Sequence, residues 1–408
     1  MTERETLHHC SMKKLDEILN LACELIEIPS VTACRNERLD QVHKIYLFIL
    51  NYLENQRLEI QRFEQGKYPA LLVGFPGAAQ QRVMLSGHFD VVAPEPDDRQ
   101  CKPQIAGDYL WGRGAEDMKT TVATFMVWMK DTLEKGPPFP PVNLLLVGNE
   151  ETGEIEPMGT GHILHLLKTE QNYQPELIIA GEQTGNRDEV WGEIRIQNRG
   201  VLRCEIIERG RHQHSAIQSN SPEMADRLFK AQNDLSEIFS VHLSLRNHDH
   251  WKSQVKFPFI KIGTPGIYNI TADYGALGIE IRALPEDNLI NLYYVIQSYC
   301  ETNHLALKVD TLKPGIACDL QNPMLQILLE SVQVSSGQNP RLGKELRGTS
   351  ACFAPRGQGV VWGQSGLGHH QADERLYIPS ILPYYNALTS FGTKLLEDRS
   401  ASSEQANT

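Results

Sequence analysis

Hydrophobic and polar residues follow two different periods along this chain of 408 residues. Residues 13–28 and 37–56 carry apolar side chains at helical spacing, which predicts two amphipathic helices. From residue 68 to residue 185, short apolar runs alternate with helix-like stretches and Gly/Pro turns. This order is typical of βαβ units and predicts an open α/β sheet.

Three of the apolar runs predict buried strands of that sheet. They are Val83–Leu85, Val142–Val147 and Leu177–Ala180. Runs with so few polar residues are typical of central parallel strands. Open α/β sheets bind their ligands beyond the carboxyl ends of the strands, so the residues that follow each run are candidates for a functional site.

The pattern changes near residue 190 and predicts a second, inserted domain. Strand-like and helix-like stretches follow the order β-α-β-β-α-β, which is the ferredoxin-like pattern. The stretches are residues 200–208, 222–238, 257–262, 277–281, 285–303 and 306–309. We therefore expect a catalytic domain of residues 1–192 and 312–408, interrupted by a domain of residues 193–311.

Histidine and acidic residues follow the predicted strands. His88 and Asp90 follow the first run after Ser86 and Gly87, and strand alternation places both on the same side. A histidine at that point can bind a metal cation while the carboxylate orients its ring. The alternative is a hydrogen-bonded loop pair.

Glu150 and Glu151 follow the second run, between Gly148 and Gly153. Two adjacent glutamates at the end of a buried strand cost free energy as bare like charges. A solvated loop would relieve that cost, and so would a division of labour in which one carboxylate binds metal and the other holds a proton. The flanking glycines indicate a shaped turn and favour the second interpretation.

Three further clusters complete the candidate site. Asp117 precedes the helical stretch Thr121–Met129, so it is either a first-turn acid of that helix or a carboxylate that bridges two cations. Glu182 follows the third run. His369 and His370 are adjacent near the end of the chain, and on an extended backbone only one of them can face the site.

Composition and charge exclude several other classes of protein. The formal charge is −12, from 51 acidic and 39 basic residues, so a basic nucleic-acid-binding face is not expected. No Lys/Arg block predicts membrane-surface binding, and no apolar stretch approaches the roughly 20 residues that cross a bilayer. The eight cysteines lack C-x-x-C pairs and predict reduced thiols. We expect a cytoplasmic protein, because the first residues lack a hydrophobic signal core.

The motifs GHFDVV, GRGAEDMK, NEETG, GEQTG and HQADE occur in this order along the chain. In sequence and spacing they resemble the zinc-dependent M20 metallopeptidase and amidohydrolase family, which includes acetylornithine deacetylases, succinyl-diaminopimelate desuccinylases, aminoacylases and carboxypeptidase G2-like enzymes. The resemblance implies an α/β, mixed-sheet catalytic domain of the zinc exopeptidase type. It also implies that the inserted ferredoxin-like domain is a lid through which two subunits form a homodimer.

The resemblance further implies a set of metal ligands. His88, Asp117 and Glu182 would hold one Zn²⁺. Asp117 would also bridge to a second Zn²⁺, held by Glu151 and His370. The choice of His370 over its neighbour follows from the H-x-x-x-E spacing to Glu374. Co²⁺ or Mn²⁺ could replace zinc at such ligands.

Five other residues have roles that the resemblance implies. Asp90 would fix the ring of His88, and Glu150 would be the general base and later the general acid. His214 of the lid would stabilise the tetrahedral oxyanion, with a solvent-facing turn histidine as the alternative. Asn269 and Arg282 would contact the substrate, although an arginine at that position could equally form a structural salt bridge.

One segment departs from the family pattern and leaves the substrate open. Residues 348–353 read GTSACF where many relatives have a segment like GTSDAR, so an acid and an arginine are absent. We consider three functions: an amidohydrolase acting on N-acyl amino acids, an exopeptidase acting on short peptides, and a catalytically silent metal-binding scaffold. The intact Glu150 and the complete ligand set argue against the third.

Overall fold

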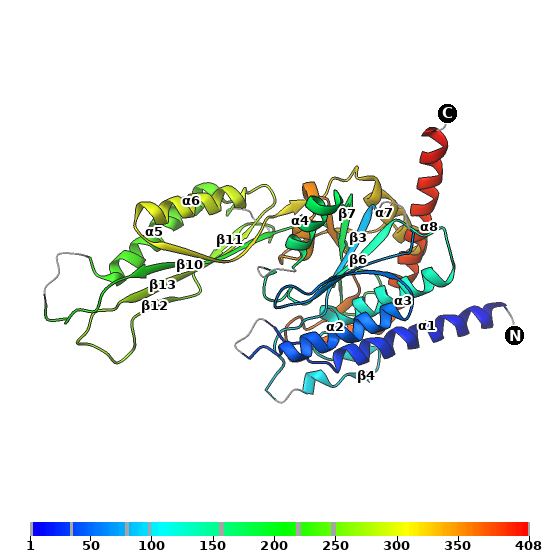
Figure 1. Cartoon of the computed structure of the whole chain (residues 1–408), viewed down its shortest axis with the longest axis horizontal. Coiled ribbons are helices and arrows are strands. Elements are labelled where there is room, and N and C mark those ends of the chain that lie inside the picture. Colours follow the sequence, from blue (N-terminus) through cyan, green and yellow to red (C-terminus); the bar gives the residue numbers. More distant parts are fainter. Residues whose placement is uncertain are drawn as a thin grey trace. The chain divides into compact units, whose positions relative to one another are not determined.

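The computed structural model describes most of the chain (Figure 1). The described ranges are residues 3–32, 36–77, 81–96, 99–154, 159–217, 222–245 and 250–406. The chain divides into two compact units, of which the second comprises residues 197–317 and 344–348. The sequence placed the boundaries of the inserted domain at 192/193 and 311/312.

A mixed sheet forms the centre of the first unit. Its strands lie in the order β1 (Glu59–Phe63), β2 (Ala70–Gly74), β6 (Val142–Val147), β3 (Val83–His88), β7 (Leu177–Ala180), β17 (Gly359–Val361) and β9 (Ile194–Asn198). β3 is parallel to both β6 and β7, and β17 is parallel to β7. β1 and β2 form an antiparallel edge. Every residue of β3, β6 and β7 is buried, as the continuous apolar runs predict.

Helices cover both faces of this sheet. They are α1 (Glu3–Ile26), α2 (Leu39–Glu54), α3 (Thr120–Glu134), α4 (Thr160–Gln171), α7 (Pro323–Ser336) and α8 (Ile381–Ala406). Leu85 and Leu144 belong to the same apolar cluster as residues of α1, α2, α3, α7 and α8. Their strand neighbours Met84 and Leu145 point to the opposite face and pack with Ile163 of α4.

A smaller sheet of short strands lies in the same unit. Its strands are β4 (Gln104–Ala106), β5 (Tyr109–Trp111), β19 (Arg375–Tyr377), β18 (Ser365–Leu367) and β8 (Gly185–Asn186), in that spatial order. Through β5 and β19 it joins a segment near residue 110 to one near residue 375. Two further short strands, β15 (Ile316–Ala317) and β16 (Leu342–Glu345), pair with β9 and belong to the central sheet.

The second unit has the ferredoxin-like pattern. Its elements are β10 (Gly200–Arg209), α5 (Met224–His242), β11 (Gln254–Lys256), β12 (Ile260–Ile262), β13 (Tyr274–Ala283), α6 (Leu289–Thr302) and β14 (Ala306–Lys313). The antiparallel sheet has the order β11-β13-β10-β14, with β12 also paired to β13. Figure 1 shows α5 and α6 side by side on this sheet, and their apolar residues share one core with Leu202 and Ile206 of β10.

The mixed α/β fold with a ferredoxin-like insertion is therefore confirmed, and one detail of the prediction is wrong. The strand expected at residues 257–262 is shorter, since only β12 (Ile260–Ile262) lies in that range, and an unpredicted short strand, β11, precedes it on the other side of Pro258. Proline has no N–H to donate to a strand ladder, so it interrupts the pairing. Among the described residues, no helix is both long and apolar enough to cross a membrane.

Candidate metal centre

Three neighbouring parallel strands carry the candidate ligands to one edge of the central sheet. β3 ends at His88, β6 ends just before Glu150 and Glu151, and β7 ends just before Glu182. Asp117 lies in a short segment, Ala115–Lys119, that leads into α3 and has non-helical φ/ψ angles at Asp117 and Met118. His370 follows β18 in a turn, so five distant parts of the sequence contribute to the cluster.

Asp117 lies between the two imidazoles that the sequence predicted as ligands. Its Oδ1 is 3.1 Å from Nε2 of His88, and its Oδ2 is 3.0 Å from Nε2 of His370. Glu182 approaches His88, with Oε1 3.6 Å from Nε2. Glu151 approaches His370, with Oε2 3.2 Å from Nε2. The structure thus brings the five predicted ligands together around Asp117. Donor atoms of Asp117, His88 and Glu151 lie within 4.8 Å of one another, and so do those of Asp117, His369 and His370.

Asp90 connects the imidazole of His88 to the glutamate turn. Nδ1 of His88 is 3.0 Å from the carbonyl oxygen of Asp90 and 3.4 Å from its Oδ1. The two carboxylate oxygens of Asp90 accept the backbone N–H groups of Glu150 and Glu151, both at 3.1 Å. Thr32 also donates its hydroxyl to Oδ2 at 2.6 Å. Asp90 therefore orients the backbone of both glutamates as well as the histidine ring.

His369 also faces the cluster, contrary to the expectation that only one of the two adjacent histidines can. Its Nδ1 is 3.2 Å from Oδ2 of Asp117 and 3.5 Å from Oε2 of Glu116. The rings of His369 and His370 stack with centroids 4.0 Å apart. The expectation assumed an extended backbone, whereas His370 has φ of 60° and follows Gly368 at φ of 82°, so the chain turns here.

Burial and mutual charge perturb the cluster strongly. Burial and the charge of Asp117 raise the pKa of Glu151 to about 7. Burial alone would lower the pKa of His370, but its hydrogen bonds to Asp117 and Glu151 prevail and raise it to about 10. Burial would likewise lower the pKa of His88, but its hydrogen bonds to Asp117 and Asp90 prevail and raise it well above its usual value. Buried carboxylates in this arrangement require positive charge beside them, and carboxylate and imidazole donors together suit a divalent metal such as zinc.

Sequence reasoning assigned no role to two buried residues beside the cluster. Lys119 is fully buried, and its Nζ donates to the carbonyl oxygens of Leu25 at 2.9 Å and Ile28 at 2.7 Å, at the C-terminal end of α1. Glu374, used only as a landmark for His370, accepts backbone N–H groups of the Asp117 segment. Lys119 and Glu374 are charged residues within two of the recognised motifs. No sequence spacing, however, indicates which distant residues they contact.

The three predicted lid residues lie in the second unit. His214 and Asn269 are both exposed and lie on adjoining segments, because His214 pairs with Ile270 and the carbonyl of Asn269 accepts the N–H of Ser215 at 3.1 Å. Arg282 is half-buried on β13, with Nε 3.3 Å from Oε1 of Glu280. The structural salt bridge weighed for Arg282 is thus present within the unit, and substrate contacts of all three residues stay predictions.

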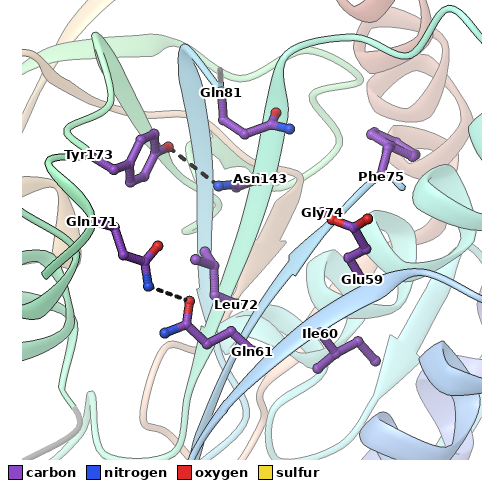
Figure 2. A pocket seen from close by; sticks show the side chains of 10 residues that line it. All are labelled: Glu59, Ile60, Gln61, Leu72, Gly74, Phe75, Gln81, Asn143, Gln171 and Tyr173. Carbon is purple, nitrogen blue, oxygen red and sulfur yellow. Dashed lines mark hydrogen bonds between the residues drawn. The ribbon is translucent and has the colours of Figure 1, made fainter. Parts of the chain in front are cut away.

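A separate cavity of about 420 Å³ lies at the opposite end of the strands (Figure 2). Asn143, at the start of β6, donates to the hydroxyl of Tyr173 at 3.5 Å, and Gln171 donates to Gln61 at 3.1 Å. Among the described residues that line it, Glu59 alone is charged. The cavity shares no residue with the cluster around Asp117.

Sequence comparison finds that this chain is similar to succinyl-diaminopimelate desuccinylases. The chain is 27% identical over 395 residues to the succinyl-diaminopimelate desuccinylase of Maricaulis maris, covering 93% of this chain and 95% of that protein. The desuccinylase of Gluconobacter oxydans is 32% identical over 316 residues, which are 75% of this chain and 79% of that protein.

Solved structures share the fold at low sequence identity. The dipeptidase Dug1p of Saccharomyces cerevisiae superposes with a TM-score of 0.70 at 14% identity, over 95% of this chain and 98% of that one. An M20 family metallo-carboxypeptidase of Sulfolobus solfataricus gives a TM-score of 0.67 at 14% identity, over 92% and 98% of the two chains.

Fold, cluster and relatives together define a metal-dependent hydrolase of amide or peptide bonds. Residues 84–394 match the sequence model of Peptidase family M20/M25/M40, and the chain belongs to this family. The family assignment and the hydrolase class expected from the ordered motifs are confirmed.

Proposed function

We propose that this protein is a two-zinc amidohydrolase that removes the acyl group from an N-acyl amino acid. The observation that carries the proposal is the placement of Asp117, whose two carboxylate oxygens face two different imidazoles at 3.1 and 3.0 Å. A carboxylate in this position could bind two cations at once.

Each side of Asp117 has its own further donor. His88 and Glu182 would complete the ligands of one ion, and Glu151 and His370 those of the other. Zinc bound there would polarise the scissile carbonyl and lower the pKa of water. The donor set consists of carboxylate oxygens and imidazole nitrogens, which bind zinc well and cobalt or manganese less selectively.

Glu150 is the proposed acid–base residue. Asp90 fixes the backbone of Glu150 next to that of Glu151, so one glutamate of the pair can serve as a ligand while the other remains beside the reacting groups. The Glu150 carboxylate would take a proton from the attacking water and return it to the nitrogen of the leaving amine. The two proton transfers therefore need only one carboxylate, which acts first as a base and then as an acid.

Three residues of the second unit have proposed roles, and so does the unit itself in the assembly. We assign oxyanion stabilisation to His214 and recognition of the substrate carboxylate to Asn269 and Arg282. A homodimer formed through this unit is part of the same proposal. The desuccinylases among the relatives support an acyl amide as substrate, and the family's peptidases make short peptides the competing class.

A substrate panel with defined metal content tests the proposal. Purified protein would be depleted of metal, reloaded with zinc, and assayed on N-acetyl and N-succinyl amino acids beside dipeptides of matched side chains. We expect two zinc ions per subunit and the highest kcat/KM on an N-acyl amino acid. A preference for the dipeptides would indicate an exopeptidase instead. Zinc-loaded protein that hydrolyses neither class of substrate would contradict the enzymatic assignment.

A further inference from the structure

The carboxylate of Glu374 is completely buried beside the candidate metal centre. It stands four positions after His370 and directly before β19. Its side chain has no exposed surface, and that of its partner Arg113 is only 4% exposed. A buried carboxylate is costly unless donors surround it, so the partners of Glu374 indicate what it does.

Three of its partners are backbone N–H groups at the start of the segment that carries Asp117. Oε1 of Glu374 accepts from Gly114 at 2.8 Å, from Glu116 at 3.2 Å and from Asp117 itself at 3.2 Å. Buried backbone N–H groups require acceptors, and Gly114 at the start of this segment has no side chain that could supply one. Glu374 supplies the acceptor from a distant part of the chain.

Its other oxygen ties the same two stretches together a second time. Oε2 accepts from Nη1 of Arg113, whose Nη2 donates to the carbonyl of Gln371 at 3.3 Å. The carbonyl of Glu374 also accepts the N–H of Gly112 at 3.2 Å. Residues 112–117 and 370–374 are therefore linked through Glu374, and each of the two stretches carries one of the imidazole–carboxylate partners described above.

We propose that Glu374 is a positioning residue that holds the Asp117 carboxylate in register with His370 and thereby sets the metal affinity of the centre. This inference rests on the proposed function, since it requires Asp117 to be a ligand. All four described groups that face the two oxygens of Glu374 are donors, so both oxygens act as acceptors. Substitution of such an outer partner typically lowers metal affinity by about 10–100-fold.

Two variants and a neighbouring control test the inference. Glu374→Ala removes all four contacts. Glu374→Gln keeps an oxygen for the backbone N–H groups but turns an N–H toward Arg113, which is also a donor. Asp373→Asn is the matched control, because Asp373 is the adjacent acid, its side chain is 58% exposed, and it pairs with Arg375 instead. Metal dissociation constants would be measured by competition with a chelator, and the ligand geometry by the visible spectrum of the cobalt-loaded protein.

We expect Glu374→Gln and Glu374→Ala to weaken zinc binding about 10–100-fold, with a changed cobalt spectrum, and Asp373→Asn to bind as the unaltered protein does. Wild-type affinity and spectrum in both Glu374 variants would overturn the inference. If the unaltered protein itself binds no metal, the proposed function fails instead, so the two failures are distinguishable.

A double substitution tests the contribution of the Glu374–Arg113 pair. In Glu374→Gln the guanidinium of Arg113 is buried without its counter-ion, which is strongly unfavourable. Adding Arg113→Gln removes that charge while leaving the oxygen that accepts the backbone N–H groups. We expect the double variant to bind zinc more tightly than Glu374→Gln alone. Equal or weaker zinc binding by the double variant would contradict the proposed geometry. If the Glu374 variants do not fold, the zinc affinity of Arg113→Gln alone is measured instead.

Discussion

Asp117 is the residue on which the arrangement of the centre depends most. It contacts His88 through one oxygen and both His369 and His370 through the other. The three imidazoles and burial act in opposite directions on its carboxyl, and the imidazoles prevail, so its pKa lies well below the usual range. Asp117 is thus ionised at neutral pH and available to more than one cation.

Replacement of Asp117 should damage metal binding more than replacement of a ligand on one side only. Asp117→Ala removes donors from both proposed ions, whereas Glu182→Ala removes one donor from the His88 side. We expect Asp117→Ala to retain less zinc per subunit and to lose more activity than the roughly 10–100-fold typical of an outer partner. Elemental analysis of both variants after zinc loading measures this, and equal zinc content in the two would show that Asp117 does not bridge.

Zinc binding should release protons and weaken as the pH falls. The pKa of His370 is raised to about 10 and that of His88 is also raised, so both rings carry protons at pH 7 when no metal competes. Metal requires the neutral ring, and each displaced proton makes affinity change about tenfold per pH unit. Calorimetry in two buffers of different ionisation enthalpy counts the protons. Affinity that stays constant from pH 6 to pH 8 would contradict this account.

The sequence was sufficient to predict the residues of the cluster but not the contacts that hold them in place. Each predicted ligand lies within a recognisable motif, and the structure brings them together. They are His88, Asp117, Glu151, Glu182 and His370. The contact between Glu374 and Gly114 joins residues 260 positions apart, and no local pattern encodes such a pair. The approach of His369 to Asp117 likewise depends on the turn at Gly368, which periodicity does not reveal.

Among the elements, the buried strands were predicted best. The runs Val142–Val147 and Leu177–Ala180 have the bounds of β6 and β7, because a strand buried on both faces has an unbroken apolar sequence. The short strands β4, β5, β18 and β19 were not predicted. Each has only three residues, and their pairing depends on tertiary contacts rather than on a pattern within the strand.

Helix caps offer a test of the elements that support the sheet. Asn322 caps α7 by accepting the N–H groups of Met324 and Leu325, and its amide donates to the carbonyl of Glu176 just before β7. Asn288 caps α6 through one such bond and is exposed. Loss of a cap typically costs about 0.5–2 kcal/mol. We expect Asn322→Ala to lie at the upper end and Asn288→Ala at the lower end, measured by urea unfolding, and the reverse order would show that the bond to Glu176 contributes little.

At the scale of the whole molecule, the chain combines an acidic composition with two compact units. The formal charge of −12 favours solubility and disfavours binding to polyanions. Each unit has its own apolar core, so substitutions in one need not disturb the other. The assignment of the second unit as a lid and dimerisation domain is part of the proposal and has a direct solution test.

A homodimer should have twice the chain mass of 46.0 kDa. Light scattering coupled to size exclusion measures the mass without assumptions about shape, and we expect the dimer value at micromolar concentration. The dimer should persist after metal removal, because the proposed interface lies in the second unit. A monomer mass across the accessible concentration range would contradict the proposed assembly while leaving the metal centre untested by that result.

The most direct measurement compares metal content and turnover in Glu150→Gln. This substitution keeps the shape of the side chain and removes its ability to take a proton, so zinc content should equal that of the unaltered protein. Turnover on the best substrate should fall by about 10²–10⁴-fold, as is typical when a general acid–base group is lost. Glu330→Gln serves as control, since Glu330 is 60% exposed and pairs with Lys394. An unchanged kcat in Glu150→Gln would contradict the central claim that Glu150 activates water beside a pair of metal ions.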